Sequence, residues 1–274
     1  MDTWVTVNGM RIHCLAAGAD GNEPPIVMVH GWAGAAADWA PLLRVLPGGT
    51  RAIAVDLPGS GQSDKPDAPY DIPWFLDFLR TFCAAAGAST IILAGHSLGG
   101  LIAVHFAARF PSVVEKLILV DPYGLRGERG KGESLARLGP LVSLGFSLNQ
   151  RAFIERAMRA NVLHRPGEEL VRTAVDSTAS SILGPGGSRA IARVTRRVVG
   201  RLHVDGLLPG IFQPTLLLWG ENDRLLPPKW GNVFASLLPR ATLQTIPETG
   251  HMPMLERPAE VAEKIARFLE GQAI

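Results

Sequence analysis

One serine lies in the setting that most clearly predicts catalysis. Residues 95–99 read Gly-His-Ser-Leu-Gly, and they follow a short apolar run and precede a stretch of helical periodicity. A G-x-S-x-G turn between a strand and a helix strains the serine backbone and presents the hydroxyl at a helix N-terminus. Flanking glycines permit the close approach that such a turn requires. The pattern predicts that Ser97 is a nucleophile; the alternative role is a helix cap.

A serine nucleophile needs a general base, and that base needs a carboxylate to orient it. Among the seven histidines, His251 follows the last predicted strand and precedes the last predicted helix. Asp223 follows the preceding predicted strand, so both residues belong to the sheet edge that also carries Ser97. Ser, Asp, His is the chain order expected when a triad is mounted on an α/β sheet. We therefore predict these residues as nucleophile, acid and base.

Four other residues compete with this assignment or support it. Asp121 also ends a predicted strand, and it stays open as an alternative acid. Asp56 precedes a glycine-containing turn and is expected to organise that loop. His30 ends a strand, where hydrogen bonds from its ring would hold the next loop in place. His96 adjoins the serine on the turn, so its side chain is expected to point elsewhere.

An acyl-transfer site also needs hydrogen-bond donors for the negative charge that develops on the carbonyl oxygen. The backbone N–H of Leu98, the residue after the serine, is one expected donor. The second is expected from residues 30–34, which read His-Gly-Trp-Ala-Gly directly after an apolar run. The N–H of Trp32 is the candidate there, because the glycines on either side let the loop fold beneath a substrate.

The elements that would position these residues alternate along the chain. Asn8-Gly9 predicts a tight turn between two antiparallel strands, and strands then alternate with helices. Continuous apolar runs are typical of strands buried on both faces of a parallel sheet. The predicted strands are Trp4–Val7, Ile12–Ala16, Ile26–Val29, Arg51–Val55, Thr90–Leu93, Lys116–Val120, Thr215–Trp219 and Thr242–Ile246; the predicted helices are Trp39–Leu46, Trp74–Ala86, Leu98–Arg109, Lys229–Leu238 and Ala259–Leu269. The expected fold is α/β, a mostly parallel central sheet with helices on both faces.

Residues 123–210 interrupt this alternation, and we interpret them as a helical cap inserted into one core of residues 1–122 and 211–274. The insertion shows amphipathic stretches at Leu135–Phe146, Arg151–Leu163 and Glu168–Ser181, and a basic stretch at Arg189–Arg201. The five arginines of that last stretch are expected to form a solvated helix face, with an anion site as the alternative. Apolar residues of the cap (Leu138, Leu141, Val142, Leu144, Phe146, Met158 and Leu163) either roof the site or pack the cap onto the core.

Composition limits the functional classes. The 274 residues are 47% hydrophobic and 19% charged, with a net charge of +2, which allows a large core and disfavours a nucleic-acid binder. The two cysteines, Cys14 and Cys83, form no disulfide framework or C-x-x-C pair and are expected to be reduced. The first residues lack a basic, then apolar, secretory pattern, and the apolar run at 91–108 is too interrupted to span a membrane. A cytoplasmic location is the expectation.

The motifs together resemble the α/β-hydrolase fold superfamily, in the branch of cap-bearing serine hydrolases with an H-G-W oxyanion loop. The segments that carry the resemblance are 30–32, 56–61, 95–100, 220–223 and 250–251. The resemblance implies a hydrolase without cofactor or metal, with Ser97 as nucleophile, His251 as base and Asp223 as acid. Epoxide hydrolases and haloalkane dehalogenases of this family use an aspartate where this chain has Ser97, so those activities are disfavoured. No dinucleotide, P-loop or H-E-x-x-H motif is present.

Hydrolysis of a carboxylic ester with a small to medium, fairly apolar acyl or alcohol group is the expected reaction. The alternative is a carbon–carbon bond hydrolase acting on vinylogous diketones, which resembling enzymes perform with the same triad. That chemistry usually needs polar groups to hold the substrate carboxylate; the cap offers Arg126, Arg151, Arg156 and Arg159, but nothing in the sequence identifies one of them as the anchor. Thioester or lactone hydrolysis and perhydrolysis are compatible with the same residues. A small-molecule receptor with low turnover is the hypothesis from another class.

Overall fold

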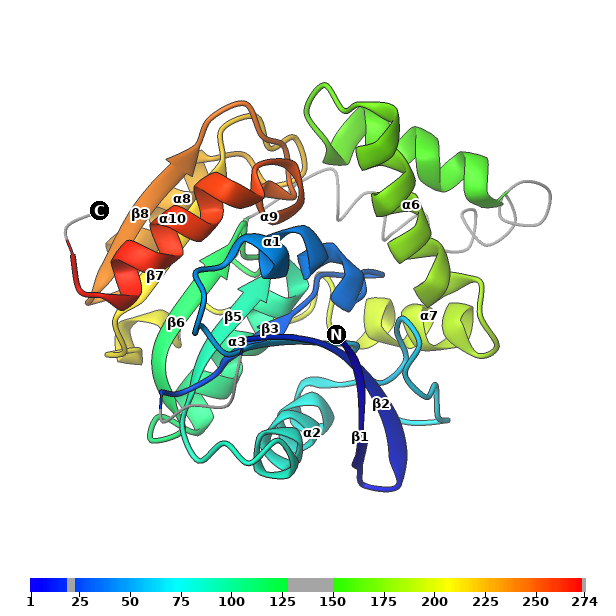
Figure 1. The fold of residues 1–274 in the computed structure, drawn as a ribbon, viewed down its shortest axis with the longest axis horizontal. Helices are drawn as coiled ribbons and strands as arrows, with labels where there is room; N and C mark the ends of the chain where they lie inside the picture. The colour runs from blue at the N-terminus through cyan, green and yellow to red at the C-terminus, as the bar shows by residue number, and fades with distance from the viewer. Residues whose placement is uncertain (19–22, 128–149, 273–274) are drawn as a thin grey trace.

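A mixed sheet crosses the molecule in the order β1-β2-β4-β3-β5-β6-β7-β8 (Figure 1). The computed structural model describes residues 1–18, 23–127 and 150–272. β1 pairs antiparallel with β2, and β2 pairs antiparallel with β4, whereas all other neighbours are parallel. The strands are β1 (Asp2–Val7), β2 (Met10–Ala17), β3 (Ile26–Val29), β4 (Ala52–Val55), β5 (Ile91–His96), β6 (Val114–Val120), β7 (Thr215–Gly220) and β8 (Ala241–Ile246). The predicted hairpin and the mostly parallel sheet are confirmed.

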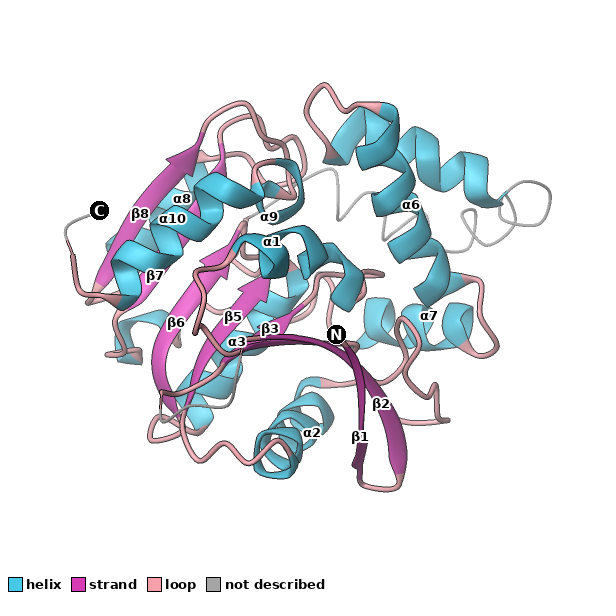
Figure 2. Cartoon of the chain, viewed as in Figure 1, coloured by secondary structure: helices cyan, strands magenta, loops and turns pink. Residues whose placement is uncertain are grey.

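Alternate side chains of the central strands enter two separate apolar cores, one on each face of the sheet. On β3, for example, Val27 and Val29 belong to one core, and Ile26 and Met28 to the other. Helices cover both faces, as Figure 2 shows. The first core packs against α2 (Ile72–Ala85), α3 (Leu98–Arg109) and α8 (Lys229–Leu237); the second packs against α1 (Ala40–Val45), α9 (Pro253–Glu256) and α10 (Pro258–Leu269). The continuous apolar runs are therefore explained by burial on both sides.

Some helices and strands begin or end at other residues than the sequence predicts. α2 begins two residues before Trp74, because the Asp71 side chain caps it by accepting a hydrogen bond from the Trp74 N–H at 3.2 Å. The helix predicted at Trp39–Leu46 divides into a 3₁₀ turn, η1 (Ala36–Trp39), and α1, with a proline in the first turn of α1. β5 continues past Leu93 to His96, so the strand carries the chain directly into the serine turn.

The insertion between β6 and β7 is helical in its described part, residues 123–127 and 150–214, where no strand occurs. A helix at 150–157 passes into the π-helical turn η2 (Met158–Val162), followed by α6 (Glu168–Ile182), α7 (Gly187–Arg197) and the 3₁₀ turn η3 (Leu208–Gly210). The predicted helix at Leu135–Phe146 lies outside the described residues. Figure 1 shows α6 and α7 beside the edge of the core. Within the described ranges, no helix has the length and apolarity needed to cross a membrane.

Candidate active site

Ser97 occupies the strained turn that the sequence predicts. Its backbone has φ 51° and ψ −115°, between the end of β5 and the start of α3. A Cβ atom at Gly95 would lie 2.4 Å from the Gly99 carbonyl oxygen, and one at Gly99 would lie 2.3 Å from the Val29 carbonyl oxygen. Only glycine fits at either position, so the turn packs directly on β3. The Ser97 side chain is half-buried at the carboxyl edge of the sheet.

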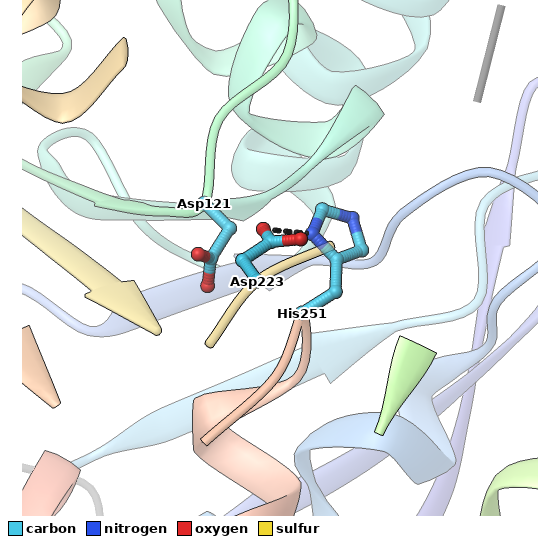
Figure 3. A group of neighbouring side chains, drawn as sticks. All are labelled: Asp121, Asp223 and His251. Carbon is cyan, nitrogen blue, oxygen red and sulfur yellow. Dashed lines mark hydrogen bonds and ion pairs between the residues drawn. The ribbon is translucent and has the colours of Figure 1, made fainter. Parts of the chain in front are cut away.

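A short contact joins the predicted acid to the predicted base. Asp223 Oδ2 lies 2.6 Å from His251 Nδ1, and both residues are buried (Figure 3). Asp223 Oδ1 accepts the N–H groups of Leu225 and Leu226 at 2.7 and 2.9 Å. Because a carboxylate only accepts hydrogen bonds, Nδ1 of the imidazole carries the proton and donates it. The unprotonated Nε2 is then available as a base.

The loop that carries His251 is fixed by a carboxylate that sequence reasoning missed. Glu256 in α9 accepts the N–H groups of Gly250 at 2.9 Å and Met252 at 3.2 Å, on either side of the histidine. It also accepts the N–H of His164, from the insertion, at 2.7 Å. The His251 N–H itself donates to the Val162 carbonyl oxygen at 2.7 Å. The available sequence signal for these contacts was an acidic residue, Glu256, in the first turn of the helix that follows His251.

The serine turn and the histidine loop are neighbours, linked by His96. Its Nε2 donates to the His251 carbonyl oxygen at 2.7 Å, and the two rings are 4.8 Å apart. Burial and the adjacent His251 hold the pKa of His96 well below its usual range, so the ring is neutral. Among the described residues, the Ser97 hydroxyl makes no hydrogen bond to His251. The His96 side chain therefore points at the histidine loop, where it supports the backbone.

The loop after β3 is held by His30, as predicted. Its Nδ1 donates to the Gly31 carbonyl oxygen at 2.8 Å, and its Nε2 accepts the Leu57 N–H at 3.1 Å. Burial lowers the pKa of His30, which suits this neutral tautomer. The backbone N–H groups of Trp32 and Leu98 donate no hydrogen bond within the described part of the chain. Both residues line one pocket, so these donors are free for a substrate oxygen.

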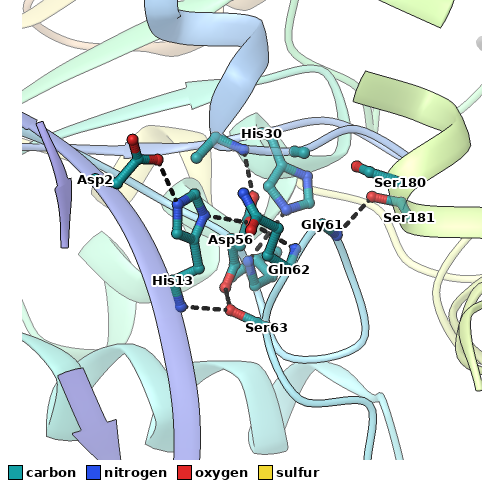
Figure 4. A network of polar contacts seen from close by, with 12 residues as sticks. Asp2, His13, His30, Asp56, Gly61, Gln62, Ser63, Ser180 and Ser181 are labelled. Carbon is teal, nitrogen blue, oxygen red and sulfur yellow. Dashed lines mark hydrogen bonds and ion pairs between the residues drawn. The ribbon is translucent and has the colours of Figure 1, made fainter. Parts of the chain in front are cut away.

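Asp56 organises the adjoining loops, which confirms its predicted role (Figure 4). Its Oδ1 accepts the Ala36 N–H at 2.6 Å, and its Oδ2 accepts the Gln62 N–H and contacts His13 Nδ1, both at 2.8 Å. The other ring nitrogen of His13 lies 3.0 Å from Asp2, at the start of β1. This polar network reaches from the N-terminal strand to the oxyanion loop.

Two side chains tie the helical insertion to the loops of the core. Ser181 of α6 accepts the Gly61 N–H at 2.7 Å and donates to the Gly34 carbonyl oxygen at 2.6 Å. The Trp32 indole, 40% exposed, donates to the Thr195 hydroxyl of α7 at 2.9 Å. The insertion is thus anchored on the loop that presents the expected oxyanion donor.

Asp121, the alternative acid, is not the partner of the histidine. Its Oδ1 accepts the Gly220 N–H at 2.9 Å, and it makes no hydrogen bond to His251. Ligand atoms of Asp121, Asp223 and His251 lie within 4.8 Å of one another, a spacing that a metal ion could use. However, three N–H donors already occupy the Asp223 oxygens, so this group fits a hydrogen-bonded relay better than a metal site.

Other candidates have structural roles. Both cysteines are buried, which raises each thiol pKa to about 12 and removes them as nucleophiles.

In the insertion, Arg151 pairs with Asp176, and Arg159 pairs with Glu155 and Glu168. Of the arginines on and after α7, Arg193 pairs with Asp67 and the rest are exposed, as a solvated face would be. Leu163 is buried in the second core and Met158 packs beside it, whereas the other five proposed roof residues lie outside the described ranges.

A small apolar pocket adjoins the two free N–H groups. It lies between residues 30–33, the loop after β4 and α7. The apolar side chains that line it come from core and insertion alike: Leu57, Pro58, Phe75, Leu98, Ala190, Ile191 and Val194. An apolar group of a substrate can therefore be held next to the donors.

Known proteins share this sequence pattern and fold. A pimeloyl-[acyl-carrier protein] methyl ester esterase of Xanthomonas oryzae pv. oryzae is 29% identical over 91% of this chain and 96% of its own length. The crystal structure of a bacterial membrane phospholipase A, a virulence factor, is 30% identical and superposes with a TM-score of 0.84, covering 99% of this chain and 86% of that chain. The meta-cleavage product hydrolase CumD of Pseudomonas fluorescens IP01, at 19% identity over 98% and 97% of the two chains and a TM-score of 0.79, shares the fold.

The sequence profile of the alpha/beta hydrolase fold matches residues 24–258, which include every candidate site residue described above. The match thus covers most of the chain, and the expected resemblance is confirmed. This chain belongs to the α/β hydrolase fold family.

Proposed function

We propose that this protein is a serine hydrolase that cleaves carboxylic esters of small to medium, fairly apolar substrates through an acyl-enzyme on Ser97. The buried 2.6 Å contact between Asp223 and His251, at the sheet edge that bears the serine turn, is the observation that carries this proposal. Esterase and phospholipase relatives support an ester as the bond that is cleaved. The cytoplasmic location and the division into core and cap stay predictions.

The proposed reaction has two halves. The Ser97 hydroxyl attacks the ester carbonyl carbon while His251 Nε2 takes its proton, and the N–H groups of Trp32 and Leu98 stabilise the oxyanion. Collapse of the intermediate expels the alcohol, which receives that proton, and leaves the acyl group on the serine. Water then attacks the acyl-enzyme with His251 again as base, which releases the acid and restores the hydroxyl.

A series of p-nitrophenyl esters of increasing acyl length tests this function. We expect turnover by the wild type that is highest for short to medium chains, since the pocket is small and apolar. Ser97→Ala should lower kcat by at least about 10³-fold, because the nucleophile is lost. A phosphonate probe should add its mass to the wild type only.

Two outcomes would overturn the esterase assignment. A vinylogous diketone hydrolysed far faster than any ester would assign carbon–carbon bond cleavage to the same residues. Tight binding of a small molecule with no ester turnover, unchanged in Ser97→Ala, would assign a receptor.

A further inference from the structure

A buried carboxyl group with an unsatisfied oxygen lies beside the Asp223–His251 pair. Asp121 directly follows β6 and is fully buried, with a backbone φ of 42°, a conformation that non-glycine residues rarely adopt. Its Oδ1 accepts the Gly220 N–H, whereas its Oδ2 is buried without a hydrogen-bond partner among the described residues. Buried polar atoms without partners are rare in proteins, so this oxygen requires an explanation.

The neighbours of that oxygen are acidic. Figure 3 shows the Asp121 carboxyl group beside that of Asp223, and both lie within the 4.8 Å cluster that includes His251. The other charged group that acts on Asp121 is Glu256, from α9. Two ionised carboxylates at this separation, both shielded from water, would repel each other strongly. A bound proton removes the repulsion and converts the unsatisfied oxygen into a donor.

We propose that Asp121 is a positioning residue that stays protonated at neutral pH and donates a hydrogen bond to the Asp223 carboxylate. The inference depends on the proposed function only in taking Asp223 as the acid of the triad. Burial, and next the charge of Asp223, raise the pKa of Asp121 well above its usual range, which agrees with this proton.

The proton has a defined effect on the reaction. With Asp121 neutral, the two aspartates carry one negative charge, which balances the single positive charge on His251 as it accepts the serine proton. Asp121 then joins Leu225, Leu226 and His251 as a donor to Asp223 and keeps the acid ionised and oriented. A second negative charge would hold the proton on the imidazole and oppose its transfer to the leaving alcohol.

Paired substitutions distinguish a donor from a second charge. Asp121→Asn keeps a donor of the same shape without a charge, so we expect kcat/KM within about threefold of wild type and an unmoved acid limb of the pH profile. Asp121→Ala removes the donor, and we expect kcat/KM to fall about 10- to 100-fold, with the acid limb shifted to higher pH. An acid limb that moves to lower pH in Asp121→Asn would show that a charge was removed and would overturn the proposal.

Infrared difference spectroscopy tests the proton without any turnover. In the Ser97→Ala background at pH 8, the spectrum of the Asp121 protein minus that of its Asp121→Asn variant should contain the C=O stretch of a protonated carboxyl group, shifted in D₂O. Other buried acids, such as Asp38 and Glu256, cancel in the subtraction. A carboxylate band in its place would overturn the proposal, whether or not the protein hydrolyses esters. Circular dichroism and the melting temperature establish that both variants fold.

Discussion

At the scale of single residues, the short contact between Asp223 and His251 fixes the tautomer of the His251 imidazole. An ionised carboxylate can only accept hydrogen bonds, so Nδ1 must carry the proton, and the lone pair remains on Nε2. The hydrogen bonds to Asp223 from the N–H groups of residues 225 and 226 keep it from rotating. In the proposed reaction, this acid therefore selects a tautomer and stabilises the imidazolium, and it need not become protonated itself.

An asparagine at position 223 should favour the other tautomer of His251, with the proton on Nε2. The Asn side chain can donate to Nδ1, which leaves the proton on Nε2 and removes the base. We expect Asp223→Asn to lower kcat by about 10³- to 10⁴-fold with the p-nitrophenyl ester that the wild type hydrolyses best. Asp77→Asn, an exposed aspartate of α2, is the matched control and should keep full activity. A loss confined to Asp121→Asn would transfer the role of the acid to Asp121.

The proposed catalytic residues could be chosen from the sequence because each lies in a local pattern. Ser97 is marked by its glycines, and Asp223 and His251 are marked by their place after predicted strands. The loop supports His30 and Asp56 could also be predicted, but Glu256 and Ser181 could not, because their contacts join segments far apart in the chain. Glu256 binds the N–H groups of two loops, and one of them belongs to the insertion. The sequence shows an acidic residue in the first turn of the helix after His251, but no spacing indicates which N–H groups it binds.

At the scale of elements, the buried Ser181 hydroxyl joins α6 to two loops of the core. Ser181 satisfies both the Gly61 N–H and the Gly34 carbonyl oxygen, and each would otherwise be buried without a partner. These two groups belong to loops that surround the pocket. The position of α6 and the shape of the pocket are therefore coupled.

Removal of that hydroxyl should loosen the connection. Ser181→Ala leaves two backbone groups unpaired, so we expect the free energy of unfolding to fall by about 1–3 kcal/mol, measured by urea denaturation. Ser180→Ala is the matched control, because the Ser180 hydroxyl bonds within α6, to the Ser177 carbonyl oxygen, and a much smaller change is expected. Equal losses in the two variants would contradict an anchoring role for Ser181.

The elements predicted best are those whose pattern reflects burial on both sides. The apolar runs of β3, β6 and β7 predict strands because both faces of the sheet are covered. The end of β5 was missed because Gly95 and His96 continue the ladder without apolar side chains: Gly95 pairs with Val29 and with Leu119. The pairing of neighbouring strands, and not local preference, fixes that boundary.

At the scale of the whole molecule, the polar network around Asp56 connects the N-terminal hairpin to the active-site loops. His13 lies between Asp2 and Asp56, and Asp56 in turn holds Ala36 and Gln62 (Figure 4). Asp56 is almost fully buried, so its charge needs these donors. The stability of the fold is thereby linked to the protonation of the network.

The direction of that link follows from the two pKa shifts. The hydrogen bond to Asp56 raises the pKa of His13 above 6.5, although burial opposes it and Asp2 adds to it. Burial works to raise the pKa of Asp56, but the His13 hydrogen bond and the backbone donors Ala36 and Gln62 together lower it. The His13 contribution to stability is therefore complete below pH 6.5 and is lost as the pH rises through its folded pKa. The Asp56 contribution is present above its unfolded pKa and is lost as the pH falls through its lowered folded value.

Substitution of His13 should expose this dependence. Because glutamine does not titrate, His13→Gln should reduce the free energy of unfolding more at pH 6 than at pH 9. The loss of unfolding free energy at pH 6 should exceed the loss at pH 9 by on the order of 1 kcal/mol for each unit by which folding raises the pKa of His13. Urea denaturation of both proteins across this pH range measures the difference, in which the contributions of the other buried histidines cancel.

Asp2→Asn should give a smaller effect of the same sign, since the Asp2 side chain is 73% exposed and its charge is screened. A cost of His13→Gln that is constant with pH would mean that the imidazole is neutral in the folded protein, and that backbone N–H groups alone compensate the Asp56 charge.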